Sequence, residues 1–145
     1  MTTSIAQREI HGVTDAQHSA MEKTMTALAK IAGTADPGIE IHEMLHAGCY
    51  VRTAKIPADT LFVSAQILIP TVLIISGDCF ITDTENTVRI TGYEVLTGAR
   101  MRQGIIRTLT ETYMTAIFAT DAKTTQEAEA SAVADTSRLY RSTEG

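Results

Sequence analysis

The sequence predicts an all-β fold, a sandwich, barrel or jelly roll that is preceded by a helical arm and followed by a helical tail. Short runs rich in β-branched and aromatic residues recur through the middle of the chain, with turn residues between them. This pattern is typical of a sandwich, barrel or jelly roll. Threonine is abundant in these runs, as expected for strands that have one solvated face. At both ends of the chain the hydrophobic spacing changes to that of a helix.

Residues 1–38 are expected to form an N-terminal helical arm and a linker. The arm has an apolar face at helical spacing, made of Met21, Met25, Leu28 and Ala32. Thr14 or Asp15 can cap the start of this helix, and Gly33 can end it. The breakers in residues 33–38 predict the loop that joins the arm to the body.

Residues 39–120 are expected to form the body of the fold, a β-barrel. Turn sequences such as Pro57-Ala58-Asp59 and Ser76-Gly77-Asp78 separate the runs. Their residues favour turns through a fixed φ, tolerance of left-handed backbone, or side-chain hydrogen bonds to the backbone. Eight strands are predicted, at residues 50–56, 60–67, 71–75, 79–82, 87–91, 94–96, 105–109 and 113–119.

Residues 121–145 are expected to form a C-terminal helical tail. Thr124 and Glu127 have the spacing of a capping box ahead of an alanine-rich stretch, so a helix is predicted from there to about Leu139. Its apolar face is thin, and such a helix is marginal when it stands alone in water. We therefore expect the tail to pack on the barrel or on a neighbouring subunit.

Charge and composition exclude several classes of partner. The chain has 145 residues, of which 12 are basic and 17 acidic, and the negative excess lies in its two ends. Because no concentrated basic face is visible, nucleic-acid binding is not expected. No apolar stretch is long enough to cross a bilayer and no secretory signal is recognisable, so we expect no membrane contact and synthesis inside the cell. The two cysteines do not make a disulfide framework.

The sharpest chemical motif is His42-Glu43-Met44-Leu45-His46. On a helix, this spacing would place two imidazoles on one face around Zn²⁺, with the glutamate as general base. Here the motif follows Pro37-Gly38 and runs into Gly48 and a β-rich run, which leaves room for hardly more than one helical turn. A coincidental match ahead of the first strand is therefore the preferred interpretation, and a zinc hydrolase is the minor alternative.

Other reactive groups are interpreted as structural. Cys79 follows Asp78, whose charge raises a thiol pKa, and it lies in a predicted strand, so a core cysteine is favoured over a nucleophile. Residues 97–104 form the one locally basic loop, with Arg100 and Arg102. This loop could meet a carboxylate or a phosphate, or it could form a solvated or inter-subunit edge, and the edge is the preferred interpretation.

Several short motifs follow one another in a fixed order over residues 40–129. They are His42-Glu43, Gly48-Cys49-Tyr50-Val51-Arg52, Ile56-Pro57-Ala58-Asp59-Thr60-Leu61, Ser76-Gly77-Asp78 and the run from Glu111 to Thr120. In order and spacing they resemble the small cupin-like proteins encoded in tailed-bacteriophage genomes. The resemblance implies a compact antiparallel jelly-roll barrel between a short helical arm and a short helical tail.

A cupin ordinarily brings metal-binding histidines from two strand regions. By the resemblance these would fall within residues 64–73 and near residues 100–107, and neither region contains a histidine. Met114 and Phe118 stand in the last strand where relatives have an aromatic residue and a histidine. We therefore expect no metal, no cofactor, no catalytic residues and a barrel interior that is packed shut. A cupin-like fold that lacks its metal-binding residues indicates a protein that is not an enzyme and that acts through its surfaces.

The favoured hypothesis is a non-enzymatic structural protein of a bacteriophage virion, either a capsid decoration or cement subunit or a tail-associated component. It would be made in the host cytoplasm. Its partners would be further copies of itself and other virion proteins, such as the major capsid or tail protein. The residues expected to make these contacts are Met21, Met25, Leu28, Arg100, Arg102 and Leu139.

The alternative hypothesis is a cupin that binds a small molecule, such as a sugar or nucleotide-sugar, or that acts as a metal-free enzyme. Tyr50, Arg52, Glu111 and Tyr113 would then line its pocket. Apolar residues dominate the central strands and offer little to orient a polar substrate, so the structural hypothesis is preferred.

Overall fold

The structure, a computed structural model, describes residues 8–32, 37–83 and 86–140, and the side chains of all of these except residues 28–32. No helix within this part of the chain is both long and apolar enough to span a membrane. The elements are β1 (Glu9–Ile10), α1 (Asp15–Ala32), β2 (Glu40–His46), β3 (Cys49–Ile56), β4 (Leu61–Val63), β5 (Thr71–Ser76), β6 (Cys79–Thr82), β7 (Thr87–Ile90), β8 (Tyr93–Gly98), β9 (Ile105–Thr108), β10 (Thr112–Ala119), α2 (Thr125–Ala132) and the short 3₁₀ helix η1 (Thr136–Arg138).

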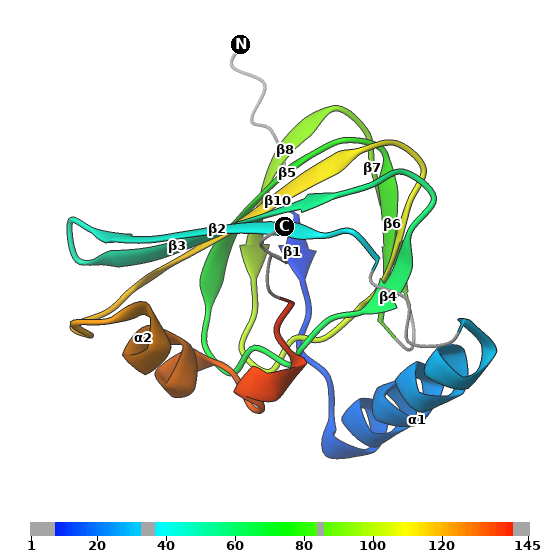
Figure 1. The fold of residues 1–145 in the computed structure, drawn as a ribbon, viewed down its shortest axis with the longest axis horizontal. Coiled ribbons are helices and arrows are strands. Elements are labelled where there is room, and N and C mark those ends of the chain that lie inside the picture. The colour runs from blue at the N-terminus through cyan, green and yellow to red at the C-terminus, as the bar shows by residue number, and fades with distance from the viewer. Residues whose placement is uncertain (1–7, 33–36, 84–85, 141–145) are drawn as a thin grey trace, which may run out of the picture.

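The strands form two sheets that face each other (Figure 1). The six-stranded sheet has the order β1-β8-β5-β10-β3-β2, and the four-stranded sheet has the order β4-β9-β6-β7. Neighbouring strands are antiparallel except β1 and β8, which run parallel. From β3 onward the chain passes back and forth between the sheets, as in a jelly roll. The prediction of a mainly β, two-sheet architecture is confirmed.

The main core lies between the two sheets. Inward and outward side chains alternate along the strands, for example in β5, where Leu73 and Ile75 are buried and Val72 is exposed. Burial of each such aliphatic side chain contributes about 2 kcal/mol. The buried members of this core are Ile10, Ile39, Ile56, Phe62, Leu73, Ile75, Cys79, Ile81, Ile90, Leu96 and Ile106.

Most predicted strands agree with the structure to within two residues, but β4 is much shorter than expected. It spans Leu61–Val63 instead of residues 60–67. Beyond β4 the chain leaves the four-stranded sheet, and Ile67 forms isolated bridges with Arg102 and Val133. The second half of the predicted strand therefore closes one end of the barrel and fixes the position of Arg102.

The segment with the two-histidine motif is a strand, whereas the sequence interpretation placed it ahead of the first strand. It forms β2, and its burial alternates with the period of two that a strand requires. Ile41, Glu43 and Leu45 are the less exposed residues, while His42 and His46 are exposed. β2 pairs with β3 along its whole length.

The N-terminal segment belongs to the folded body, which differs from the expected division at residue 38. β1 pairs with β8, so this segment enters the six-stranded sheet. Helix α1 starts after Thr14, whose hydroxyl accepts a hydrogen bond from the Gln17 amide at 3.2 Å. Met21, on the inner face of α1, is 1% exposed and packs against Val13 and Val63.

The C-terminal segment also packs on the barrel, through helix α2. The Thr124 hydroxyl caps this helix and accepts a hydrogen bond from the Glu127 amide at 3.1 Å. The helix ends at Ala132 and not near Leu139, because Val133 turns away and forms a bridge with Ile67. Beneath α2 lies a second core cluster of Tyr50, Ala65, Phe118, Ala128, Ala132 and Val133.

Candidate ligand-binding site between the sheets

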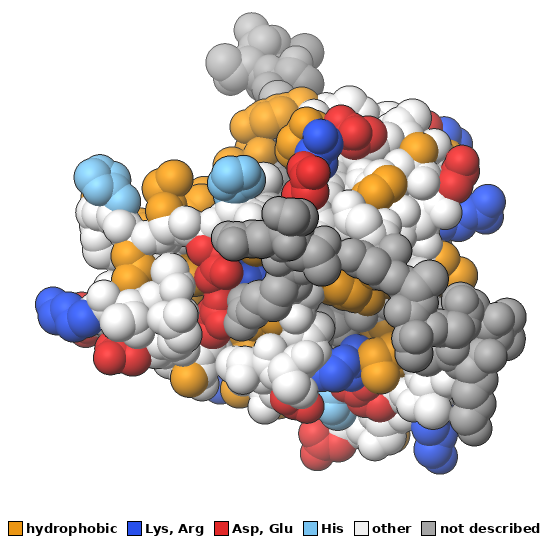
Figure 2. Space-filling view, viewed as in Figure 1, with side chains coloured by type: hydrophobic (Ala, Val, Ile, Leu, Met, Phe, Trp, Pro, Cys, Tyr) orange, Lys and Arg blue, Asp and Glu red, His pale blue; other side chains and the backbone are white. Residues whose placement is uncertain are grey.

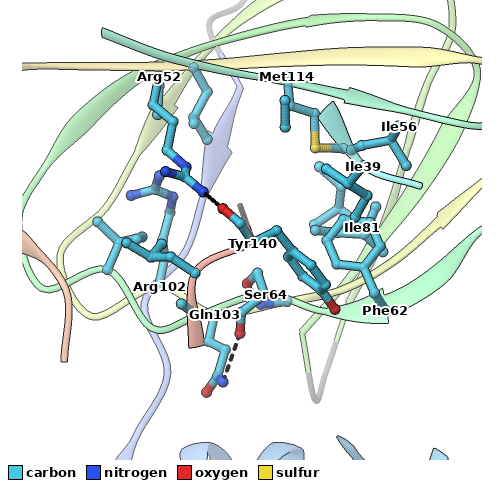
Figure 3. Close-up of a pocket in the computed structure, with 18 of the residues that line it drawn as sticks. Ile39, Arg52, Ile56, Phe62, Ser64, Ile81, Arg102, Gln103, Met114 and Tyr140 are labelled. Atoms are coloured by element: carbon cyan, nitrogen blue, oxygen red, sulfur yellow. Dashed lines mark hydrogen bonds between the residues drawn. The ribbon is translucent and has the colours of Figure 1, made fainter. Parts of the chain in front are cut away.

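A cavity of about 180 Å³ lies between the two sheets (Figure 3). Most of its wall is aliphatic and comes from both sheets, including Ile39, Ile56, Leu73, Ile75, Ile81 and Ile106. The expectation that the barrel interior is packed shut is therefore wrong. The cavity remains open because two small residues, Ala54 on β3 and Ala116 on β10, face it. Larger side chains at these positions would fill the space.

Polar groups gather on one side of this cavity. Arg52 on β3 and Arg102 before β9 both line it, and Figure 3 shows their guanidinium groups on the same side. Gln103 and Ser64 lie at the lower end in that view, where Gln103 Nε2 donates a hydrogen bond to the Ser64 carbonyl oxygen at 3.0 Å. An aliphatic wall with a few polar groups on one side is the usual composition of a small-molecule site.

The C-terminal segment forms part of the cavity wall. Tyr140 follows η1, and its ring packs edge-on against Phe62 with the centroids 5.4 Å apart. The Tyr140 carbonyl oxygen accepts a hydrogen bond from Arg52 Nη2 (Figure 3). Burial raises the pKa of the Tyr140 phenol. These contacts join the C-terminal segment to both sheets.

Helix α1 and η1 are fixed to the same end of the barrel by polar contacts. His18 Nδ1 lies 2.5 Å from Gln103 Oε1. Glu22 forms an ion pair with Arg138 of η1, and its carboxyl also lies 3.8 Å from His18 Nε2. The helix, the residues before β9 and the C-terminal segment therefore hold one another in place around the cavity.

A cluster of ionisable side chains beside the cavity joins helix α2 to β2 and β3. The Tyr50 hydroxyl oxygen lies 2.9 Å from Glu43 Oε2 and 3.1 Å from Glu129 Oε1. Arg52 Nη1 lies 3.6 Å from Glu43 Oε1 and 3.7 Å from Glu129 Oε1. Glu129 is only 3% exposed, so water screens this cluster poorly.

The geometry of this cluster favours retention of a proton. Tyr50 has a single hydroxyl hydrogen, yet its oxygen contacts two carboxyl groups. Burial and the neighbouring Glu129 carboxyl raise the pKa of Glu43, against the opposite effects of Tyr50 and Arg52. Burial also raises the pKa of the Tyr50 phenol. The Glu43 and Glu129 carboxyl groups, which share one arginine, therefore bind one proton more tightly than a solvated glutamate binds its proton.

The structure buries two residues that the sequence assigned to partner contacts. Met21 packs in the chain's own core, because helix α1 lies against β4. Arg102 is 8% exposed, because its backbone pairs with Ile67 at the closed end of the barrel. Neither side chain is accessible to another protein in this structure, so the expected partner contacts are corrected at Met21 and Arg102.

The remaining predicted contact residues lie nearer the surface. Arg100 is exposed. Met25 is half-buried beside the core cluster of Met21, and Leu139 is half-buried against the cluster beneath α2. The side chain of Leu28 lies outside the described residues. A role of these four residues in partner contacts stays a prediction.

Two of the four pocket residues of the alternative hypothesis point inward. Arg52 lines the cavity, and Tyr50, which is 2% exposed, lies in the core beneath α2. Glu111 instead is exposed and lies 3.9 Å from the Lys55 ammonium group, while Tyr113 is 43% exposed. Side chains alternate along β10, so Tyr113 points away from the cavity that its neighbour Met114 lines.

The histidine motif does not form a metal site. His42 and His46 are four residues apart on a strand, which places them about 13 Å from each other, too far to share one ion. Glu43 points to the opposite face. Among the described residues, no group of three or more His, Cys, Asp and Glu is placed to hold a metal ion.

Cys79 is a core residue. Its side chain is fully buried, and burial, with a smaller effect of the Asp78 charge, raises the pKa of its thiol to about 11. A thiol with this pKa carries almost no thiolate at neutral pH and is a poor nucleophile.

Sequence reasoning missed Gln103 and Glu129. Gln103 is 1% exposed and joins α1 to the barrel, but a single glutamine in a basic loop gives no local signal of burial. Glu129 does leave one signal. It lies between Ala128 and Ala132 on the thin apolar face of the tail, where an acidic residue is buried only if a partner meets it.

Comparison with solved structures identifies the type of fold. A cupin superfamily protein from Desulfitobacterium hafniense superposes with a TM-score of 0.50 and 14% sequence identity, over 65% of this chain and 88% of that chain. The chain therefore has a cupin-like fold. At this identity the similarity shows the fold alone.

Two further structures show lower similarity. A cupin-2 domain containing protein from Shewanella frigidimarina has a TM-score of 0.46 and 9% identity, over 68% of this chain and 98% of that chain. A salicylate 1,2-dioxygenase from Pseudaminobacter salicylatoxidans has a TM-score of 0.49 and 12% identity, over 68% of this chain and 32% of that chain. No protein-family model and no curated protein matches the sequence.

Proposed function

We propose that this cupin-like barrel is a binding protein for a small, mostly apolar molecule held between its two sheets. The observation that carries the proposal is the cavity of about 180 Å³ with its aliphatic wall. Well-packed cores contain few voids larger than a water molecule, so an apolar cavity of this size between the sheets supports a role in binding. The proposal keeps the small-molecule class of the alternative hypothesis but replaces the sugar with an apolar ligand.

The size of the cavity limits the ligand. An apolar cavity of about 150 Å³ is known to stay dry and to hold one benzene ring. A cavity of about 180 Å³ therefore fits one six-membered ring or an alkyl chain of similar volume. The aliphatic wall would contribute affinity through burial of apolar surface, and the polar groups on one side would orient the molecule.

Filling the cavity should abolish binding. We expect toluene to shift the NMR signals of the Ile39, Ile56 and Ile75 methyl groups, which line the cavity. Ala116→Leu places a larger side chain into the same space, so the toluene affinity should fall by about tenfold or more, equivalent to about 1.4 kcal/mol. Titration by methyl NMR measures both affinities.

A matched control on the same strand is Ala119→Leu. Ala119 is exposed at the end of β10 and does not line the cavity, so this variant should bind toluene as the wild type does. The absence of any methyl shift in the wild type, or equal binding by Ala116→Leu, would contradict the proposed function.

A second candidate function is assembly, the role expected from the resemblance to phage proteins. It is favoured by exposed apolar side chains on the outer face of the six-stranded sheet: Met44 (55% exposed), Val72 (45%), Tyr93 (69%), Val95 (47%) and Tyr113 (43%). Figure 2 shows hydrophobic side chains gathered at the top of the molecule, over β5 and β8. Contiguous apolar patches of this kind often mark contacts between proteins. Membership of a virion stays a prediction.

Self-association through this outer face can be tested with a single charge. If the face joins two copies, Val72→Asp should convert an oligomer into a monomer, because it buries an unpaired carboxylate. Thr87→Asp is the control, since Thr87 is exposed on β7 of the other sheet. Light scattering gives the mass of each variant, and a wild type that is monomeric at about 100 μM would exclude a standard-sized interface here.

A further inference from the structure

Arg102 is a buried cation without a counter-charge. It is 8% exposed, and no described residue places a carboxylate within ion-pair distance of it. Its Nη1 has no hydrogen-bond partner among the described residues. Burial lowers its pKa to about 10, so it still carries its charge at neutral pH. By contrast, Arg52 and Arg138, the other arginines that line the cavity, both face glutamates.

The surroundings of Arg102 keep its charge at the cavity wall. The Arg102 amide donates to the Ile67 carbonyl oxygen at 3.0 Å, and its carbonyl oxygen accepts from the Ile67 amide at 2.9 Å. Its side chain passes over Gly98, where a Cβ would lie only 3.0 Å from Arg102 Nε. A side chain at position 98 would therefore displace the arginine, and the glycine leaves room for it.

A second unpartnered polar atom lies next to the Arg102 side chain. The Thr71 hydroxyl oxygen is buried and has no hydrogen-bond partner among the described residues. It lies 2.6 Å from the point where a Cβ of Gly98 would stand, close to the Arg102 Nε described above. An unpaired buried charge destabilises the folded protein, and a buried hydroxyl without a partner does so to a smaller extent. Of these two residues Arg102 lines the cavity, so an anion bound there would pair with its guanidinium group.

We propose that the molecule held in the barrel carries a carboxylate group that pairs with Arg102, so that the ligand is a small monocarboxylic acid with an apolar body. This inference rests on the proposed function and adds the chemical class of the ligand. A carboxylate offers two oxygens to the guanidinium fork. The single unpaired charge of Arg102 would neutralise a carboxylate, which carries one negative charge. A phosphate ester with two negative charges would keep one of them uncompensated in a buried site, so a carboxylate is favoured over a phosphate. The aliphatic wall then contacts the ring or chain.

The proposal is tested with two probes that have the same chain length and differ in the head group, a carboxylate or a hydroxyl. Hexanoate and hexanol have chains of the same length, and both fit a cavity of this size. We expect the wild type to bind hexanoate about tenfold or more tightly than hexanol at pH 7, in line with a charge-assisted hydrogen bond. Arg102→Met should bring the affinities for hexanoate and hexanol to within about twofold of each other. Isothermal titration measures both affinities.

Arg100→Met is the matched control, because Arg100 is an exposed arginine two residues away. It should leave the preference for hexanoate intact. Arg102→Gln serves as a second neutral variant if Arg102→Met does not fold. Without ligand, both neutral Arg102 variants should unfold at a higher urea concentration than the wild type, because an uncompensated buried charge is removed, whereas a purely structural arginine would give the opposite result.

The outcomes separate the two proposals. Equal affinity of the wild type for hexanoate and hexanol would overturn the role of Arg102 but leave an apolar binding site. A preference for hexanoate that survives in Arg102→Met would also overturn it, since the carboxylate would then lie elsewhere. Failure of both probes and of toluene to bind would instead overturn the proposed function itself.

Discussion

The double variant Glu43→Gln/Glu129→Gln should unfold at a much lower urea concentration than the wild type at pH 7. Arg52 is 13% exposed in its side chain, and these two carboxyl groups are its ion-pair partners among the described residues. Removing the partners of a buried charge costs about 3 kcal/mol or more. A third substitution, Arg52→Met, should restore most of this loss, because it removes the charge that was left unpaired.

A matched control exists on the surface of the same sheet. Lys55 also faces two glutamates, Glu40 at 3.7 Å and Glu111 at 3.9 Å, but it is 40% exposed in its side chain. Glu40→Gln/Glu111→Gln should therefore leave the urea midpoint almost unchanged, since exposed ion pairs contribute little. If the buried and the exposed double variants were equally stable, the cluster around Arg52 would have no special role.

In the single variant Glu43→Gln, the stability towards urea should decrease less as the pH rises than it does in the wild type. The pKa of Glu43 is raised in the folded state, first by burial and then by Glu129. The folded protein therefore binds this proton more tightly than the unfolded chain does. The stabilisation is complete below the unfolded pKa of about 4.3 and is lost as the pH rises through the folded pKa. Urea midpoints at about pH 5 and pH 8 should differ more for the wild type than for Glu43→Gln.

Gly12→Ala should destabilise the protein by about 3 kcal/mol, the upper end of what overpacking costs. A Cβ at this position would stand far closer to the Arg100 carbonyl oxygen than van der Waals contact allows. That oxygen belongs to the backbone and cannot rotate away. The clash can be relieved only if the segment around β1 separates from β8, which would also break the hydrogen bonds Val13 N to Met101 O and Ala99 N to Ile10 O.

Denaturant unfolding together with hydrogen exchange checks this prediction. The amides of Val13 and Ala99 should exchange faster in Gly12→Ala, because their partners move away. Gly48→Ala is the control, since nothing lies within 4 Å of its Cβ position and only a φ of +72° opposes the substitution. It should cost about 1 kcal/mol. Equal stability of Gly12→Ala and the wild type would show that β1 does not contribute to the folded body.

The strands were predictable from sequence because their signal is local. Alternation and turn residues define β5, β6 and β10 almost to the residue, and the Thr124–Glu127 spacing defines the start of α2. β2 is absent from the predicted strands because its two histidines have the spacing of a helical motif, although Ile41 and Leu45 alternate with polar residues as a strand does. The end of α2 was missed because the bridge from Val133 to Ile67 is a tertiary contact.

The site was less predictable than the fold because cavities and ion pairs are properties of packing. Nothing local in the sequence shows that Ala54 and Ala116 face the same space from neighbouring strands. The sequence predicts a basic loop that could meet a carboxylate, and it does not distinguish Arg100 from Arg102. The structure separates them, since Arg100 is exposed and Arg102 is buried, and only the backbone bridge to Ile67 decides which one turns inward.

The pairing of β3 with β10 has a consequence for the rate of folding. These strands pair along their whole length, from Cys49 with Ala119 to Ile56 with Thr112, although most of the barrel lies between them in the sequence. Long loops must close before such contacts form, so folding is expected on the millisecond to second scale of non-local β topologies. The cavity exists only after this closure. A molecule bound inside therefore slows unfolding and leaves the rate of folding unchanged.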